Sequence, residues 1–214
     1  MKVKQEKRPY HSRKRAKQAA NTREDVILAA RRLFISLGWA KTTIAKIAAA
    51  AGVSNETVYS VFGTKTALLQ ELVSQAVRGD NPGLPLIEQD RPKQIERETD
   101  QGKQIELFAQ DITAILSRVA PLMDVARTAA GTEPEMARLY SRFHQGRRTN
   151  LEWFAATLLQ NGPLKGGLDA GEAGTILWRL ASPELFLLIN RVEKCASPAY
   201  AQWLADSLRN LLLD

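Results

Sequence analysis

Residues 42–69 read TTIAKIAAAAGVSNETVYSVFGTKTALL and decide the fold of this chain. From Ile44, small and apolar residues recur at helical spacing up to Gly52, and a second short helix is expected from Ser54 to about Ser60. Gly52 can supply the positive φ that redirects the chain, and the Ser54 hydroxyl can accept from the first free amides of the next helix. The segment therefore predicts a helix–turn–helix.

The outward face of the second helix is polar. Its hydrogen-bonding side chains are Asn55, Glu56, Thr57, Tyr59 and Ser60. Side chains of this kind read base edges and contact phosphates, which makes double-stranded DNA the first partner to consider. A helical hairpin with a solvated polar face would give the same pattern, so the pattern alone leaves both interpretations open.

The flanking residues favour DNA. Residues 22–78 resemble the TetR family of bacterial transcriptional regulators. The matching positions are Gly38-Trp39, Thr42-Thr43, Ile47-Ala48, Ala51-Gly52-Val53-Ser54, Thr57-Val58-Tyr59, Phe62-Gly63, Lys65 and Leu68-Leu69. The chain departs from the family pattern at Ser60-Val61, where many members carry Tyr-His.

The resemblance implies a role for each matching polar position. The expected phosphate contacts are Thr43, Tyr59 and Lys65. The residues expected at base edges are Asn55, Glu56 and Thr57, with Ser54 and Ser60 able to do either. The resemblance also implies a homodimer on a palindromic operator, most often a repressor, that a small-molecule effector releases. A DNA-associated protein of the same fold without small-molecule control is the alternative.

The charge of the chain is concentrated at its N-terminus. The formal net charge is +7, and residues 1–20 carry eight Lys or Arg against one Glu, so the remainder sums to zero. A positive field at one end suits an anionic polymer. We expect residues 1–20 to form a flexible basic arm that lies on phosphates or enters a minor groove, and a solvated tail without a role is the alternative. The basic residues assigned to DNA in this arm are Arg13, Lys14, Arg15 and Lys17.

Other features narrow the class of protein. Cys195 is the only cysteine and cannot form an internal disulfide, which favours a reducing compartment. His11 and His144 lie far apart without metal-ligand spacing, so no metal or cofactor is expected. Cys195 and His144 could in principle form a nucleophile pair, but no orienting group can be named, and an enzyme is not expected. No apolar run approaches membrane-spanning length, and a cytoplasmic protein is the expectation.

The remaining sequence predicts an all-α protein of two domains. Residues 21–79 would form the three-helix DNA-binding domain, beginning near Thr22 with Gly38 ending its first helix. Residues 80–103 are rich in Gly, Pro and charge and are expected to be a linker or insertion. Residues 104–214 show only helical periodicity.

The resemblance implies that residues 104–214 bind the effector and dimerise. The residues expected at a ligand pocket are Phe108, Ile112, Met123, Arg127, Phe143, His144, Trp153 and Trp178. The last helices are more apolar than one buried stripe requires, so a two-fold bundle is expected to cover them, with a larger monomeric core as the alternative. The residues assigned to this interface are Leu185, Leu188, Tyr200, Trp203, Leu204, Leu208 and Leu211.

Overall fold

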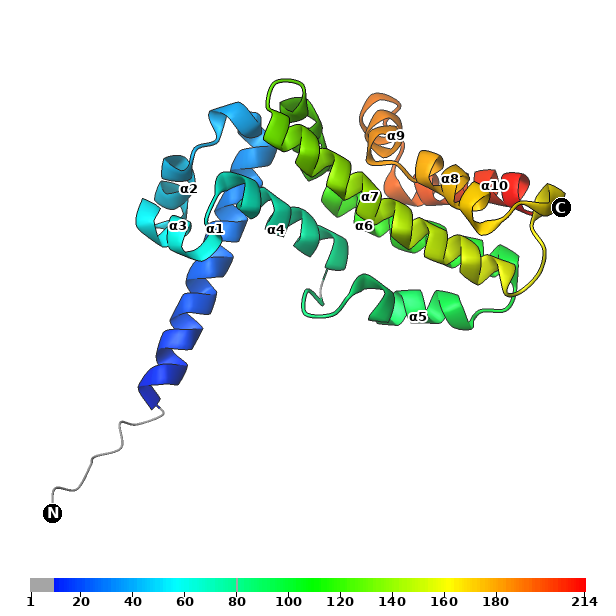
Figure 1. The fold of residues 1–214 in the computed structure, drawn as a ribbon, viewed down its shortest axis with the longest axis horizontal. Helices are drawn as coiled ribbons and strands as arrows, with labels where there is room; N and C mark the ends of the chain where they lie inside the picture. Colours follow the sequence, from blue (N-terminus) through cyan, green and yellow to red (C-terminus); the bar gives the residue numbers. More distant parts are fainter. Residues whose placement is uncertain (1–9, 80) are drawn as a thin grey trace, which may run out of the picture. The chain divides into compact units, whose positions relative to one another are not determined.

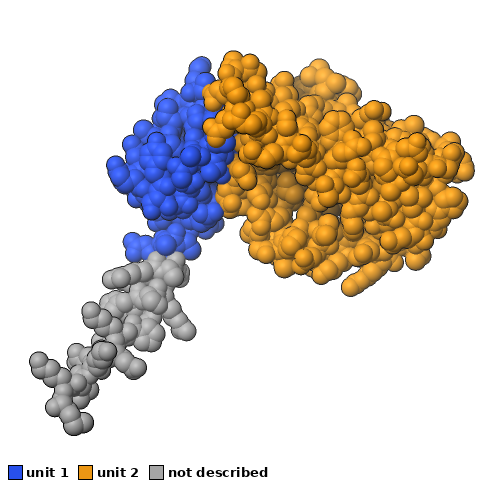
Figure 2. All heavy atoms as spheres, in the orientation of Figure 1, with its two compact units in different colours: residues 1–69 blue, residues 70–214 orange. Residues whose placement is uncertain are grey.

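The computed structural model describes residues 10–79 and 81–214, with side chains from residue 18 onward. Within these ranges every regular element is a helix, which confirms the predicted all-α class. The chain forms two compact units, residues 1–69 and 70–214 (Figure 2). The sequence placed the boundary at residue 79, whereas the division falls inside helix α4, which therefore contributes residues to both units.

The first unit contains three helices and the first turn of a fourth. They are α1 (Tyr10–Lys41), α2 (Ile44–Ala51), α3 (Asn55–Phe62) and the start of α4 (Lys65–Arg78). Gly38 has φ 73° and interrupts the helical backbone of α1, as predicted from the sequence. The largest buried side chains of this unit are Phe34, Ile47, Leu68 and Leu69.

Helix α1 begins at Tyr10 rather than near Thr22, so residues 10–20 are helical and the prediction of a flexible arm is wrong for them. The reason lies in the residues before Thr22, which are mostly Arg, Lys, Gln and Ala and favour helix. The side chains of the predicted DNA contacts there, Arg13, Lys14, Arg15 and Lys17, lie outside the described part of the structure.

The second unit is built around two long helices, α6 (Gln101–Ala130) and α7 (Pro134–Leu159), which lie side by side (Figure 1). Helix α8 packs on α7, whereas α9 and α10 pack on α6. The other elements are η1 (Leu86–Glu88), α5 (Asp90–Arg97), η2 (Lys165–Gly167), α8 (Ala170–Leu180), α9 (Pro183–Leu187), η3 (Leu188–Val192) and α10 (Ser197–Leu212). The sequence itself sets where α6 and α8 begin, because the side chains of Asp100 and Asp169 cap the N-termini of these helices.

The segment expected to be a linker carries structure of its own. Helix α5 buries Pro92 and Ile95 against α6, and the Gln104 amide donates to the Ile95 carbonyl at 3.0 Å. The Gln89 amide donates to the carbonyls of Arg78 and Leu84, at 3.0 and 3.3 Å. In an unstructured linker, water would hydrogen-bond to these backbone carbonyls. Here the side-chain amides of Gln89 and Gln104 do so instead.

Three residues assigned to a dimer interface are core residues instead. Tyr200, Leu204 and Leu208 are fully buried inside the second unit, so that part of the prediction is wrong. Helical spacing identifies a stripe that must be covered, and here the rest of the same chain covers it. The exposed apolar residues of the predicted set are Leu188, Trp203 and Leu211, with Leu185 partly exposed.

Candidate nucleic-acid interface and helical cavity

The turn between α2 and α3 has the geometry that the sequence predicted. Gly52 adopts φ 67° and ψ 30°, the left-handed conformation that ends α2, and the Val53 amide donates to the Ala48 carbonyl at 3.0 Å. The Ser54 hydroxyl then caps α3 by accepting from the Thr57 amide at 3.2 Å. These contacts hold α3 at a defined angle to α2.

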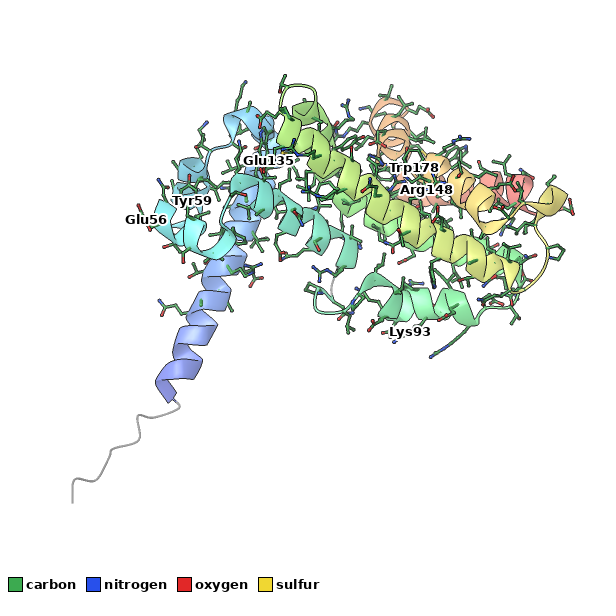
Figure 3. All side chains as sticks on the ribbon, in the orientation of Figure 1. Glu56, Tyr59, Lys93, Glu135, Arg148 and Trp178 are labelled. Atoms are coloured by element: carbon green, nitrogen blue, oxygen red, sulfur yellow. The ribbon has the colours of Figure 1, made fainter. Side chains whose placement is uncertain are left out.

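Helix α3 has one buried face and one open polar face. Val58 is buried, whereas Tyr59 is 54% exposed. Figure 3 shows Glu56 and Tyr59 on this helix. The other exposed polar residues of the segment are Ser54, Asn55 and Ser60, and Thr57 is partly exposed. The structure therefore gathers the predicted α3 residues on one accessible surface of a rigid element.

Glu56 gives this surface a local negative charge. Hydrogen bonds from its own backbone amide and from Ser54 lower the pKa of its carboxyl group. A carboxylate repels phosphate, and its favourable partner on DNA is the amino group of cytosine in the major groove.

Lys65 is engaged within the protein. Its ammonium donates to the carbonyl of Trp39 at 3.0 Å and to that of Thr42 at 3.1 Å, and it lies 3.9 Å from the centroid of the Trp39 ring. The resemblance assigned this lysine to a phosphate. The observed contacts make it a brace between the end of α1 and the start of α4, and the phosphate contact stays a prediction.

Thr43 caps α2, since its hydroxyl accepts from the Lys46 amide at 3.2 Å. The side chain is exposed, and the hydroxyl keeps its own proton to donate. Two exposed lysines, Lys41 and Lys46, flank it in sequence. Lys41 and Lys46 were not predicted as DNA contacts, although cationic residues beside a helix N-terminus are a recognisable signal for phosphate binding.

The second unit contains a cavity of about 650 Å³. Its wall combines the C-terminal half of α4, residues 85–87 and facing sides of α6 and α7. Representative apolar residues of the wall are Val73, Val77, Ile112, Leu116, Met123 and Phe143. The polar residues are Gln70, Ser74, Arg78, Arg142, Arg147, Thr149 and Asn150.

Only part of the predicted ligand set lines this cavity. Ile112, Met123 and Phe143 do, whereas His144, Trp153 and Trp178 do not. Phe108 does not line the cavity either, because it stacks on Phe154 in the core with ring centroids 4.0 Å apart.

Arg127 is the other predicted pocket residue that does not line the cavity. Its guanidinium pairs with Asp124 at 2.8 Å on the exposed side of α6. Helical periodicity cannot tell a residue that faces a cavity from one that faces a filled core.

His144 belongs to a polar cluster that ties α7 to α8 and α9. Arg147 donates to His144 Nδ1 at 3.0 Å and to the carbonyls of Trp178 and Ala181, each at 3.0 Å. The contact to Nδ1 requires that nitrogen to be unprotonated. Burial lowers the pKa of the Arg147 guanidinium to about 10.

Glu184 completes this cluster from α9. Tyr140 donates to Glu184 Oε1 at 2.6 Å, and His144 Nε2 lies at a longer 3.5 Å. Burial alone would raise the pKa of Glu184, but the contacts with His144 and Tyr140 lower it to about 2. The carboxylate is therefore charged, and it orients the α7 side chains against α9.

The described contacts do not pair Cys195 with His144. The Cys195 thiol lies 3.6 Å from the Ala196 carbonyl, while His144 contacts Tyr140, Arg147 and Glu184. Among the residues that the structure describes, no group of three or more His, Cys, Asp or Glu could hold a metal ion. In the same part of the chain, none of the helices has both the length and the apolar character needed to cross a membrane.

Comparison with known proteins places this geometry in context. A family model described as bacterial regulatory proteins, tetR family, matches residues 26–72, which include α2, α3 and the brace at Lys65. No curated protein matches the chain.

Solved structures match nearly the whole chain at low sequence identity. NalD of Pseudomonas aeruginosa, the secondary repressor of the MexAB-OprM multidrug efflux pump, is 21% identical with a TM-score of 0.68; the match covers 92% of this chain and 98% of that one. FadR of Bacillus subtilis, in complex with stearoyl-CoA, is 19% identical with a TM-score of 0.68 over 86% and 96% of the two chains. A regulator from Saccharomonospora viridis, in complex with choline, is 17% identical with a TM-score of 0.66 over 91% and 99%. These likenesses establish the fold of both units.

Proposed function

We propose that this chain, whose residues 26–72 match the model of the tetR family of bacterial regulatory proteins, is a transcriptional repressor that binds a palindromic operator as a homodimer. One observation carries the proposal. The glycine turn and the serine cap fix α3 so that a contiguous polar surface is accessible on a helix of eight residues. A helix presented in this way enters the major groove, where base edges are distinguishable.

The residues of this surface divide by chemistry. Asn55 and Thr57 donate and accept hydrogen bonds at base edges, and Glu56 accepts from cytosine. Tyr59 and Thr43 donate hydroxyl protons to phosphates, and Ser54 and Ser60 supplement either set. The basic N-terminal segment adds attraction that does not depend on DNA sequence.

A second copy would cover the apolar residues that α9, η3 and α10 leave exposed. Val192 is 69% exposed, Leu188 50%, and Leu211 46%. Exposed apolar residues gathered in one part of a chain favour association. A two-fold pair of chains presents two α3 helices, which matches a palindrome.

Control by a small molecule is the second half of the proposal. Helix α4 runs from Lys65, which braces the DNA-binding unit, to Val73 and Val77 in the cavity wall. A molecule that binds the cavity better in the DNA-free state would lower DNA affinity by its differential affinity for the two states. The repressor role of NalD and the stearoyl-CoA bound to FadR support this arrangement by analogy.

Selection of bound duplexes from a random DNA library tests the proposal. The wild type should enrich a palindrome, and Tyr59→Ala should bind the enriched duplex more weakly, because Tyr59 is exposed on the proposed interface. Tyr140→Phe, in the second unit, serves as a control and should retain binding. Failure of the wild type to enrich any sequence at any salt concentration would refute the proposal.

A further inference from the structure

The charged residues that line the cavity of the second unit are all positive. Its lining includes Arg78, Arg142 and Arg147 and contains neither Asp nor Glu. The other lining residues are neutral, and most of them are apolar. Charges in such surroundings interact more strongly than in water, because the local dielectric is low.

Two of the three guanidinium groups are held by the protein. Arg78 donates to the Pro82 carbonyl at 2.6 Å and to the Ser74 hydroxyl at 2.6 Å. Arg147 donates to the carbonyls of Trp178 and Ala181. These hydrogen bonds are with neutral groups, although the charged Glu184 carboxylate also acts electrostatically on Arg147.

Arg142 differs from both. It lines the cavity, its side chain is exposed, and within the described part of the chain it makes no hydrogen bond or ion pair. A guanidinium presents several donors in a planar fork that matches a carboxylate or similar oxyanion. The cavity therefore has apolar walls and one available cationic group.

We propose that this cavity binds an amphipathic anion, with an apolar body against the α6 and α7 walls and a single oxyanion head on Arg142. A cationic ligand would face three arginines in a lining that holds no carboxylate, and a neutral one would leave Arg142 unused. The volume of 650 Å³ lies within the range of about 300–1,000 Å³ usual for ligand pockets. The regulatory consequence of binding rests on the proposed function, whereas binding itself does not.

Gly146 offers a way to block the cavity without disturbing the fold. It lies in the wall on α7, and a Cβ added there meets no atom within 4 Å. A leucine at this position would occupy open space in or beside the cavity.

Isothermal titration calorimetry with three probes of the same alkyl chain tests the proposal. The probes are decanoate, 1-decanol and decyltrimethylammonium, used with the full-length protein. We expect decanoate to bind most tightly and Arg142→Gln to weaken it about tenfold, as expected for losing a charge-assisted hydrogen bond. Arg142→Lys should restore part of the affinity. Arg138→Gln, an exposed charge on the same helix outside the cavity, should change it by less than about twofold. Gly146→Leu should weaken decanoate and decanol alike.

Several outcomes would overturn the proposal. They are tighter binding of the cation or the alcohol, equal effects of Arg142→Gln and Arg138→Gln, and no binding of any probe. DNA binding of the same preparation without probe separates the two proposals. DNA binding without decanoate binding would refute the ligand assignment alone, and decanoate binding without DNA binding would refute the proposed function alone.

Discussion

The ammonium of Lys65 lies 3.9 Å from the ring centroid of Trp39 and donates to the carbonyl of the same residue at 3.0 Å. The Trp39 ring in turn stacks on Phe34, with centroids 5.6 Å apart. One lysine at the start of α4 thus fixes the chain where α1 ends. Its contribution is to the stability of the DNA-binding unit.

Lys65→Met should destabilise this unit, because two backbone carbonyls lose a charged donor and the ring loses its cation. We expect a loss of about 1–3 kcal/mol in the free energy of unfolding, measured by urea denaturation. Lys46→Met, which alters an exposed lysine on α2, is the matched control and should cost less. An unchanged stability together with a fall of about one in the salt slope of DNA binding would restore the phosphate role.

Two glycines in the second unit should respond to alanine in opposite directions. A Cβ on Gly174 would lie 2.8 Å from Cγ and 3.3 Å from Cα of Glu152, so Gly174→Ala should push α8 away from α7 and cost about 1–3 kcal/mol. Gly146→Ala meets open space in the middle of α7 and should stabilise by about 0.5–1 kcal/mol. Urea denaturation of both variants checks the contrast, and a shared sign would contradict the packing described.

Glu184 should make stability depend on acidity. Its pKa falls from 4.5 to about 2 on folding, so its contribution is complete above about pH 4.5 and is lost as the pH falls towards 2. Glu184→Gln should remove that dependence and flatten the slope of unfolding free energy, by less than the one-proton limit of about 1.4 kcal/mol per pH unit because the side chain is 38% exposed and solvent screens its contacts. Denaturation curves of the wild type and of Glu184→Gln between pH 5 and pH 2 measure how the free energy of unfolding depends on pH. Parallel slopes for the two proteins would show that the cluster with Tyr140 does not hold this carboxylate.

Removal of residues 1–17 should weaken DNA binding mainly at low salt. The segment carries eight basic residues and one acidic residue, and its attraction to phosphates is screened by added salt. The affinity of wild type and truncated protein for one duplex, measured by fluorescence anisotropy over a range of salt concentrations, gives both slopes. An unchanged slope would discard a role for this segment.

The DNA-binding unit was largely predictable because its signals are local. Gly38 interrupts α1 with a positive φ, Gly52 ends α2 in the left-handed conformation expected of it, and Ser54 caps the next helix. The internal contacts of Lys65 were not predicted because its partners, Trp39 and Thr42, are more than twenty residues away in sequence. A charged residue at the start of a helix gives no local sign of a distant carbonyl.

The sequence predicted that the second unit is all-α. It did not predict which residues face the core, the cavity or the solvent. The stripe of Tyr200, Leu204 and Leu208 was identified as needing cover, yet only tertiary contacts reveal that the chain covers it itself. Arg142 is exposed, and it was not assigned to the pocket from the sequence. Arg142 also lines a cavity, because α4 and residues 85–87 complete the wall of that cavity. The sequence of α7 alone does not reveal these neighbours.

In the proposed function, the exposed face of α3 reads the operator. Duplex selection with a variant that replaces Asn55, Glu56 and Thr57 by alanine, and leaves the Ser54 cap in place, tests this reading directly. The variant should keep salt-dependent binding to DNA but no longer enrich the palindrome selected by the wild type. Enrichment of the same palindrome by both proteins would contradict it.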